Sequence, residues 1–108
     1  MNHRLKIGDR WIGDEDPTYF IAEIGANFNG EIETAKALIY AAKESGADAA
    51  KFQTFTAENL VSPHSFKRLN IGYQAEWDEP AYTVYEKAEF PRAWHKELFE
   101  YATELGIE

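Results

Sequence analysis

Two short segments of the chain are almost wholly apolar until their last residues, where charged and amide side chains appear. The first covers residues 19–24 and the second residues 49–55. Apolar runs of this length, bounded by turn residues, are typical of parallel strands that are buried on both faces. The pattern therefore predicts two buried strands that end in polar groups.

The segment between these strands has helical periodicity. It begins at Asn29 or Gly30, carries acidic residues in its first turn, and ends at Gly46, where a left-handed cap is expected. Strand, helix and strand together predict a β–α–β unit over residues 19–55. The apolar stripe of the helix consists of Ile32, Ala35, Leu38, Ile39 and Ala42.

Three further elements follow from similar patterns. Gly8-Asp9 separates two short apolar stretches and predicts a β-hairpin near the N-terminus. Residues 56–90 form an unusually long connection, in which residues 80–87 predict a short helix with proline at its first position. A second full helix is predicted over residues 91–105. Its apolar stripe consists of Trp94, Leu98, Tyr101, Ala102 and Leu105.

These elements predict an α/β protein. Residues 1–17 are assigned to the hairpin and residues 18–108 to two successive βα units. Two parallel strands, a hairpin and two helices do not cover both faces of a sheet. We therefore expect the chain to be the opening part of a larger α/β fold, truncated after its second helix, and we expect no cooperative unfolding transition from these 108 residues alone.

Composition excludes several classes of protein. The formal charge is −8, from 11 basic and 19 acidic side chains, and the basic residues form no run, so a nucleic-acid-binding surface is not expected. The absence of cysteine excludes disulfides and thiolate metal sites, and His3, His64 and His95 show no ligand spacing. With no 18-residue apolar run and no signal-peptide core, we expect a soluble cytoplasmic protein without membrane partners.

The polar ends of the two predicted strands supply the candidate catalytic groups. Glu23, Lys51 and Gln53 share one strand parity, so we expect them on one side of the sheet. If the strands are parallel neighbours, the three side chains meet at the carboxyl ends, where α/β proteins place their active sites. A carboxylate and an ammonium there would orient a polar substrate and shift each other's pKa. A purely structural ion pair is the alternative, and the pattern leaves both interpretations open.

The loop after the first strand resembles a phosphate-binding loop only weakly. Its glycines stand at positions 25 and 30, but Glu31 occupies the place of the lysine that a Walker loop requires. Asn27, beside a helix N-terminus, is a candidate contact for an anion or a sugar hydroxyl. For Asn29 a helix cap and turn is the better explanation.

Several of these segments together resemble the N-terminal third of the sialic acid synthase family, the nonulosonate synthases. The resemblance spans nearly the whole chain and is carried by Ala-Glu-Ile-Gly at 22–25, Asn-Phe-Asn-Gly at 27–30 and Gly-Ala-Asp-Ala-Ala-Lys-Phe-Gln-Thr-Phe at 46–55. It implies a (β/α)8 TIM barrel in the complete protein, often followed by a small antifreeze-like domain, and a homodimer. These residues would then form the first two βα units of that barrel.

The resemblance also implies a reaction. Family members condense phosphoenolpyruvate with an open-chain N-acylmannosamine-type sugar, assisted by Mn²⁺ or Mg²⁺, whose histidine ligands lie further along the chain. By match to the family's motifs, Lys51 would hold the phosphate or carboxylate of phosphoenolpyruvate and Gln53 would contact the sugar. Glu23 would orient the reactants or handle a proton near the forming bond. The present segment alone is expected to be inactive.

One position departs from the family pattern. Members commonly carry histidine where this chain has Phe28, and an apolar ring neither binds a metal nor moves protons. This departure keeps two alternatives open. One is a non-catalytic polysaccharide-biosynthesis protein, and the other is a different barrel lyase or aldolase that uses Lys51 on a phosphorylated substrate.

Overall fold

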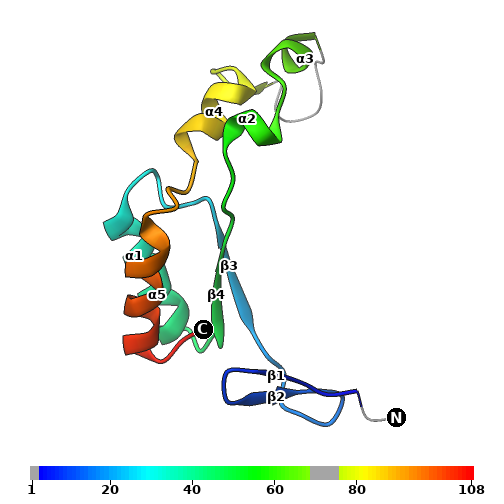
Figure 1. Cartoon of the computed structure of the whole chain (residues 1–108), viewed down its shortest axis with the longest axis vertical. Helices are drawn as coiled ribbons and strands as arrows, with labels where there is room; N and C mark the ends of the chain where they lie inside the picture. Colours follow the sequence, from blue (N-terminus) through cyan, green and yellow to red (C-terminus); the bar gives the residue numbers. More distant parts are fainter. Residues whose placement is uncertain (1–2, 69–75) are drawn as a thin grey trace.

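A parallel two-stranded sheet with two helices along one face forms the centre of the fold (Figure 1). The computed structural model describes residues 3–68 and 76–108. The hairpin β1–β2 lies beyond the amino ends of β3 and β4, and the helices α2, α3 and α4 stand beyond their carboxyl ends. In chain order the elements are β1 (Leu5–Ile7), β2 (Arg10–Ile12), β3 (Ile21–Gly25), α1 (Ile32–Glu44), β4 (Ala49–Phe52), α2 (Ala57–Leu60), α3 (Pro63–Arg68), α4 (Ala81–Lys87) and α5 (Trp94–Leu105).

The pairing of β3 with β4 is parallel, and Glu23 lies directly opposite Lys51. The register then shifts, because Gly25 rather than Ile24 pairs with Phe52, so Ile24 is the extra residue of a β-bulge. The two predicted strands are therefore confirmed as parallel neighbours, but their predicted bounds of 19–24 and 49–55 are wrong. β4 ends early because β3 leaves the sheet at Gly25, whose φ is +61°.

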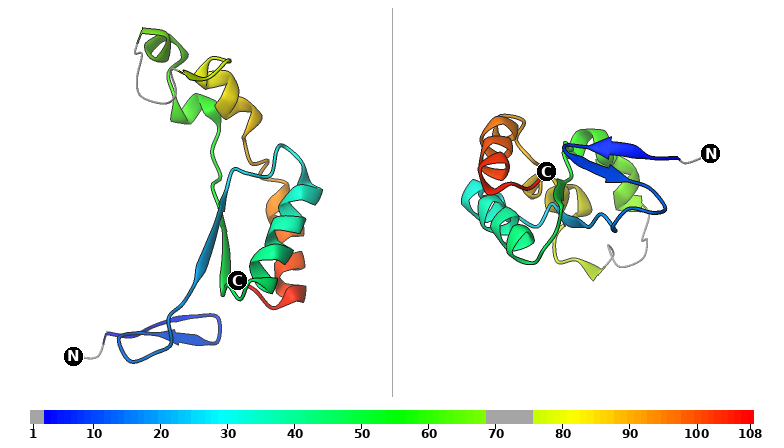
Figure 2. Two further views of the ribbon diagram at one scale, coloured as in Figure 1. Left: turned by 180° about the vertical axis from the view of Figure 1, so that it is seen from behind. Right: turned by 90° about the horizontal axis from the view of Figure 1, so that it is seen from below.

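The apolar core lies between the sheet and the helices α1 and α5, which run side by side (Figure 2). The predicted stripes of both helices are confirmed, because every residue of them is either buried or packed against the buried cluster. The fully or nearly buried members of the core are Ile24, Phe28, Ala35, Ile39, Ala42, Phe90, Leu98, Ala102 and Ile107.

Among the described residues, Phe28 is the largest side chain that is completely buried. Its ring centroid lies 5.6 Å from those of Phe90 and Trp94 and 6.3 Å from that of Phe52, mostly in edge-to-face or tilted geometry. The position at which the chain departs from the family pattern is therefore a packing position, on the helix-covered side of the sheet.

The predicted start of the first helix is wrong by two or three residues. Asn29 and Gly30 have φ values of +53° and +71°, which a right-handed helix does not allow, so α1 begins at Ile32. The left-handed cap predicted at Gly46 is confirmed by its φ of +88°, and Gly106, with φ of +75°, ends α5 in the same conformation. Within residues 3–68 and 76–108, no helix is both long and apolar enough to span a membrane.

Among its described residues, 53–68 and 76–93, the connection after β4 contains three helices, of which the sequence predicted only α4. α2 and α3 have four and six residues, too few to show an apolar stripe. Pro80 precedes α4 as its N-cap rather than occupying its first turn, and α5 begins at Trp94 because residues 91–93 form turns. The ring of Tyr85 contacts those of Phe55 and Trp77, with centroids 5.9 Å apart in each pair.

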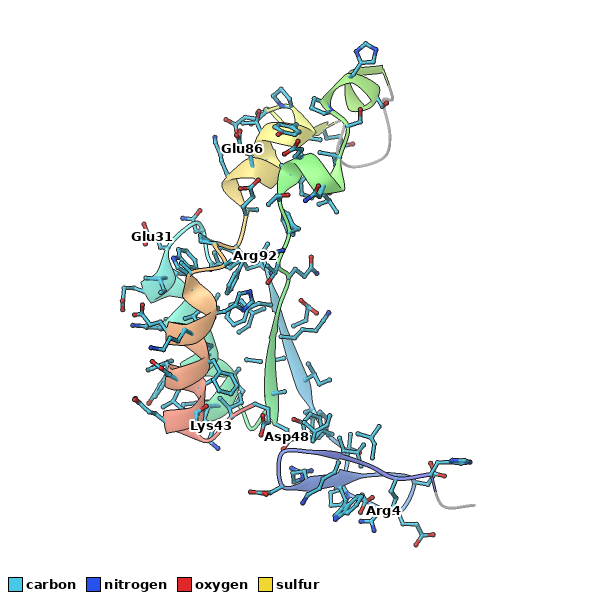
Figure 3. All side chains as sticks on the ribbon, in the orientation of Figure 1. Arg4, Glu31, Lys43, Asp48, Glu86 and Arg92 are labelled. Atoms are coloured by element: carbon cyan, nitrogen blue, oxygen red, sulfur yellow. The ribbon has the colours of Figure 1, made fainter. Side chains whose placement is uncertain are left out.

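The predicted hairpin is confirmed as an antiparallel pair, and Asp48 links it to the central sheet. One oxygen of Asp48 accepts a hydrogen bond from the backbone N–H of Phe20 at 2.8 Å, and the other forms an ion pair with Arg10. These contacts, the Phe20 bond first, lower the pKa of Asp48. The carboxylate of Asp48 thus connects β2 of the hairpin, through Arg10, to the residues that precede β3 and β4 (Figure 3).

The edge of β4 that faces away from β3 is engaged by Glu108. The backbone N–H of Glu108 donates to the carbonyl of Asp48 at 3.1 Å, and the N–H of Ala50 donates to the carbonyl of Glu108 at 2.7 Å. Two bonds that flank one residue in this way are the pattern of a parallel ladder.

We predict that Phe28→Ala lowers the free energy of unfolding by about 3–5 kcal/mol, because it leaves a cavity among three aromatic rings. Urea denaturation of the complete polypeptide, followed by tryptophan fluorescence, measures this, because a cooperative transition is not expected from the 108 residues alone. The matched control is Phe99→Ala, at a side chain that is 69% exposed, which should change the value by no more than about 0.5 kcal/mol. Equal effects of the two substitutions would contradict the assigned core.

We predict that Asp48 makes a pH-dependent contribution to the free energy of unfolding. Because its pKa is lowered in the folded state, the ionised carboxylate stabilises the fold above its ordinary value of 3.8, and this stabilisation is lost as the pH falls through the lowered pKa. Asp48→Asn should therefore destabilise the protein at pH 7 and flatten the fall in stability below pH ~4. Asp14→Asn, at an exposed residue of the N-terminal region, is the control and should leave both unchanged.

Candidate active site

Glu23 and Lys51 form an ion pair near the carboxyl ends of β3 and β4. Oε2 of Glu23 lies 2.6 Å from Nζ of Lys51, and the side chains are 48% and 58% exposed. The strand residues of opposite parity pack in or against the core, namely Ala22, Ile24, Ala50 and Phe52. Glu23 and Lys51 therefore project from the sheet face opposite α1 and α5. No helix or strand of the described residues covers that face (Figure 1). Lysine has three donors, so Lys51 keeps donors for a second acceptor while it binds Glu23.

The carboxylate of Glu23 is held in its charged form. Its pKa is lowered, chiefly by the hydrogen bond from Lys51 and by the charge of Lys51, with smaller contributions from the Gln53 side chain and the Gly25 backbone N–H. Partial desolvation acts in the opposite direction. The structure thus brings Glu23, Lys51 and Gln53 together, as the strand parity predicted, and it keeps the acid ionised at neutral pH.

Asn27 lies in the turn that follows β3. Its backbone N–H and its side-chain Nδ2 both donate to the carbonyl of Ile24, at 3.2 and 3.0 Å. Part of the amide is therefore used to close the turn. Asn29 is no helix cap, because its φ of +53° places it in the left-handed region, two residues before the N-cap at Glu31.

A second polar cluster, which the strand pattern did not predict, lies on the helix side of the same strand end. Oγ1 of Thr54 lies 3.2 Å from Nε2 of His95, whose ring is 4.7 Å from that of Phe90. Beside them is a cavity of about 200 Å³, lined by Thr54, Phe55, Thr56, Asn59, Leu60, Phe90 and Arg92. Successive side chains of an extended segment point to opposite faces, so Thr54 points away from the face that carries Gln53. This alternation in the sequence could have predicted that Thr54 lies apart from the cluster of Glu23, Lys51 and Gln53.

No arrangement of ligands for a metal ion is found in this part of the protein. Within residues 3–68 and 76–108, no three histidine, aspartate or glutamate side chains gather closely enough to hold one. The donor set of the site is one carboxylate, one ammonium and amides, which suits hydrogen bonding and charge stabilisation of a polar substrate.

Comparison with known protein families shows to which family the chain is related. The NeuB family matches residues 38–108, which are more than half of the length of this chain. This chain belongs to the NeuB family. The resemblance to sialic acid synthases, inferred from the strand motifs, is thereby confirmed.

Relatives in the NeuB family include named synthases. The N,N'-diacetyllegionaminic acid synthase of Legionella pneumophila is 43% identical over 96 residues, which are 89% of this chain and 27% of that protein. The pseudaminic acid synthase of Campylobacter jejuni is 42% identical over 104 residues, or 95% of this chain and 29% of that protein. The chain therefore spans between a quarter and a third of the length of these relatives.

Solved structures agree with this assignment. The N-acetylneuraminic acid synthetase of Leptospira borgpetersenii matches 99% of this chain and 33% of its own, with a TM-score of 0.74 and 27% identity. The spore coat polysaccharide biosynthesis protein SpsE of Bacillus subtilis matches 97% of this chain and 26% of its own, with a TM-score of 0.67 and 32% identity. The α/β arrangement thus resembles that of the sialic acid synthetase and of SpsE.

We predict that Lys51→Met raises the pKa of Glu23, because Lys51 is the main cause of its lowering. A carbon-13 NMR titration of the Glu23 carboxyl group measures this. The ionised Glu23 carboxylate stabilises the folded protein above its ordinary pKa of 4.5, and this stabilisation is lost as the pH falls through the lowered pKa. In the Lys51→Met variant the free energy of unfolding should therefore depend less on pH in the acid range.

The control for this prediction is Lys87→Met. Nζ of Lys87 lies 2.6 Å from Oε1 of Glu79, in a pair of similar exposure to that of Lys51 and Glu23. The substitution Lys87→Met removes the same positive charge far from Glu23, so it should leave the pKa of Glu23 unchanged. If both variants shift that pKa equally, the contact between Glu23 and Lys51 is not its cause.

Proposed function

We propose that this chain forms the first two βα units of a synthase that condenses phosphoenolpyruvate with an N-acylmannosamine-type sugar to give a sialic-acid-like nonulosonate. The observation that carries the proposal is the contact between Glu23 and Lys51 at the open carboxyl end of two parallel strands. The names of the legionaminic acid and pseudaminic acid synthases among the relatives support this class of product.

We propose that the complete protein closes into a (β/α)8 barrel. Two features support this. The bonds of Glu108 to Asp48 and Ala50 begin a parallel pairing on the free edge of β4, as a third barrel strand would. The sheet face that carries Glu23 and Lys51 also leaves Ile21 56% exposed, which suits a surface that further strands enclose.

The proposed reaction needs positioning and charge stabilisation from these residues. The methylene carbon of phosphoenolpyruvate attacks the aldehyde carbon of the sugar and forms the carbon–carbon bond. Water adds to the cation left at the enol carbon, and inorganic phosphate departs. Lys51 would bind the phosphate or carboxylate of phosphoenolpyruvate, Gln53 and Asn27 would contact the sugar, and Glu23 would orient the reactants or exchange a proton near the new bond.

The divalent metal that the family implies is not accommodated by the described residues, which offer no cluster of ligands. We propose that any Mn²⁺ or Mg²⁺ is held by residues outside this segment. No step assigned to Glu23, Lys51 or Gln53 depends on it.

A second candidate function is a role in polysaccharide biosynthesis without catalysis. The similarity to SpsE, whose name states only such a biosynthetic role, favours it, as does Phe28 in place of the usual histidine. The complete burial of Phe28 weakens the second point, because its side chain packs in the core and is remote from the polar face.

The test is phosphate release from phosphoenolpyruvate by the complete polypeptide, assayed with several N-acyl sugars and with Mn²⁺ or Mg²⁺. Lys51→Ala should raise the KM for phosphoenolpyruvate by about 10- to 100-fold or abolish activity, as expected for the loss of a charge-assisted hydrogen bond. Lys96→Ala, at a side chain that is 87% exposed on α5, should behave as the unmodified protein.

Three outcomes separate the candidates. Phosphate release that depends on both substrates and on Lys51 supports the synthase. A folded protein that releases phosphate with none of the sugars supports the non-catalytic role. Trapping of a carbonyl substrate on Lys51 by borohydride would instead indicate a Schiff-base lyase or aldolase.

A further inference from the structure

We propose that Gly25 is a positioning residue for Glu23, because the absence of a side chain at position 25 leaves the space that the carboxylate occupies. The catalytic consequence of this inference rests on the proposed synthase function, whereas its structural part does not. Gly25 touches no substrate in this account and acts only through Glu23 and Gln53.

The first support is the conformation of Gly25. Gly25 closes the β-bulge that follows the pair Glu23–Lys51. Its backbone φ of +61° is a value that residues other than glycine rarely adopt. The carbonyl of Gly25 accepts a hydrogen bond from the backbone N–H of Gln53 at 3.1 Å. The bulge therefore sets the direction in which β3 leaves the sheet and, at the same time, the place of Gln53.

The second support is the crowding around its α-carbon. A Cβ atom at position 25 would lie 3.2 Å from Oε1 of Glu23, 3.8 Å from Nε2 of Gln53 and 3.9 Å from Nδ2 of Asn27. The other oxygen of Glu23, Oε2, is bound to Lys51 at 2.6 Å. The carboxylate is thus enclosed on two sides, and a methyl group at position 25 would require it to shift by a few tenths of an ångström against its contact with Lys51.

Gly46 provides a matched comparison within the same protein. Its φ is +88°, so a side chain there meets a similar backbone penalty, but no atom lies within 4 Å of its Cβ position. Comparing alanine at the two sites separates backbone strain, which both share, from displacement of Glu23, which only position 25 produces. Lys51 is the charged group that contacts Glu23 among the described residues, so a change in their geometry is read directly in the titration of Glu23.

The experiment compares Gly25→Ala with Gly46→Ala by a carbon-13 NMR titration of the Glu23 carboxyl group. Gly25→Ala should raise the pKa of Glu23 toward its ordinary value of 4.5, and Gly46→Ala should leave it unchanged. In the phosphate-release assay Gly25→Ala should lower kcat by several-fold, less than the about 100-fold expected for a displacement of about 1 Å, and Gly46→Ala should leave kcat unchanged. An unchanged pKa in Gly25→Ala, or equal shifts in both variants, would overturn the inference.

A double-mutant comparison decides the case even if Gly25→Ala does not fold. In a Glu23→Ala background there is no carboxylate to displace, so adding Gly25→Ala should lower the urea midpoint no more than Gly46→Ala does. Recovery of folding in the double variant supports the inference, and failure to recover refutes it. If the complete polypeptide shows no synthase activity at all, the proposed function fails, while the titration and the unfolding data still judge the role of Gly25.

Discussion

The parallel pairing of β3 with β4 in one register determines where every polar group of the site lies. Because side chains alternate along a strand, a slip of one residue would turn Lys51 toward the helices and leave Glu23 without its partner. The observed register instead places both at the carboxyl ends of adjacent strands, on the face that α1 and α5 do not cover. The chemistry of the site is thus a consequence of strand alignment.

What holds that alignment is the apolar side of the sheet. Phe28, Phe52, Phe90 and Trp94 contact one another there, and the stripes of α1 and α5 pack onto the same layer. The ion pair between Glu23 and Lys51 is about half exposed, and such pairs add little to stability. The core therefore positions the charges, and the charges remain available for binding.

The strand–helix–strand unit and the grouping of Glu23 with Lys51 and Gln53 were predictable from the sequence. Both depend on regular periodicity, which the apolar residues display clearly. The ends of elements were not predictable, because they depend on local backbone conformation. Asn29 in the left-handed region delays α1, and the bulge at Ile24 and Gly25 shortens the sheet. The helices α2 and α3 were missed because each is shorter than two turns.

The contact between Thr54 and His95 was unpredictable for a related reason, since it joins residues 41 positions apart in sequence, one just after β4 and the other in α5, that only the folded chain brings together. The named synthases among the relatives add what the pattern alone could not supply, namely the class of product to test for. The Gly25 bulge in turn gives a physical reason for part of the Ala-Glu-Ile-Gly motif, because the glycine sits against the carboxylate two residues before it.

The most direct measurement is a crystal structure of the complete polypeptide with bound phosphoenolpyruvate. We predict a phosphate or carboxylate oxygen of the ligand within hydrogen-bonding distance of Lys51 Nζ, with Glu23 still opposite Lys51 on the parallel strand pair. A ligand bound elsewhere, with Lys51 contacting Glu23 alone, would contradict it.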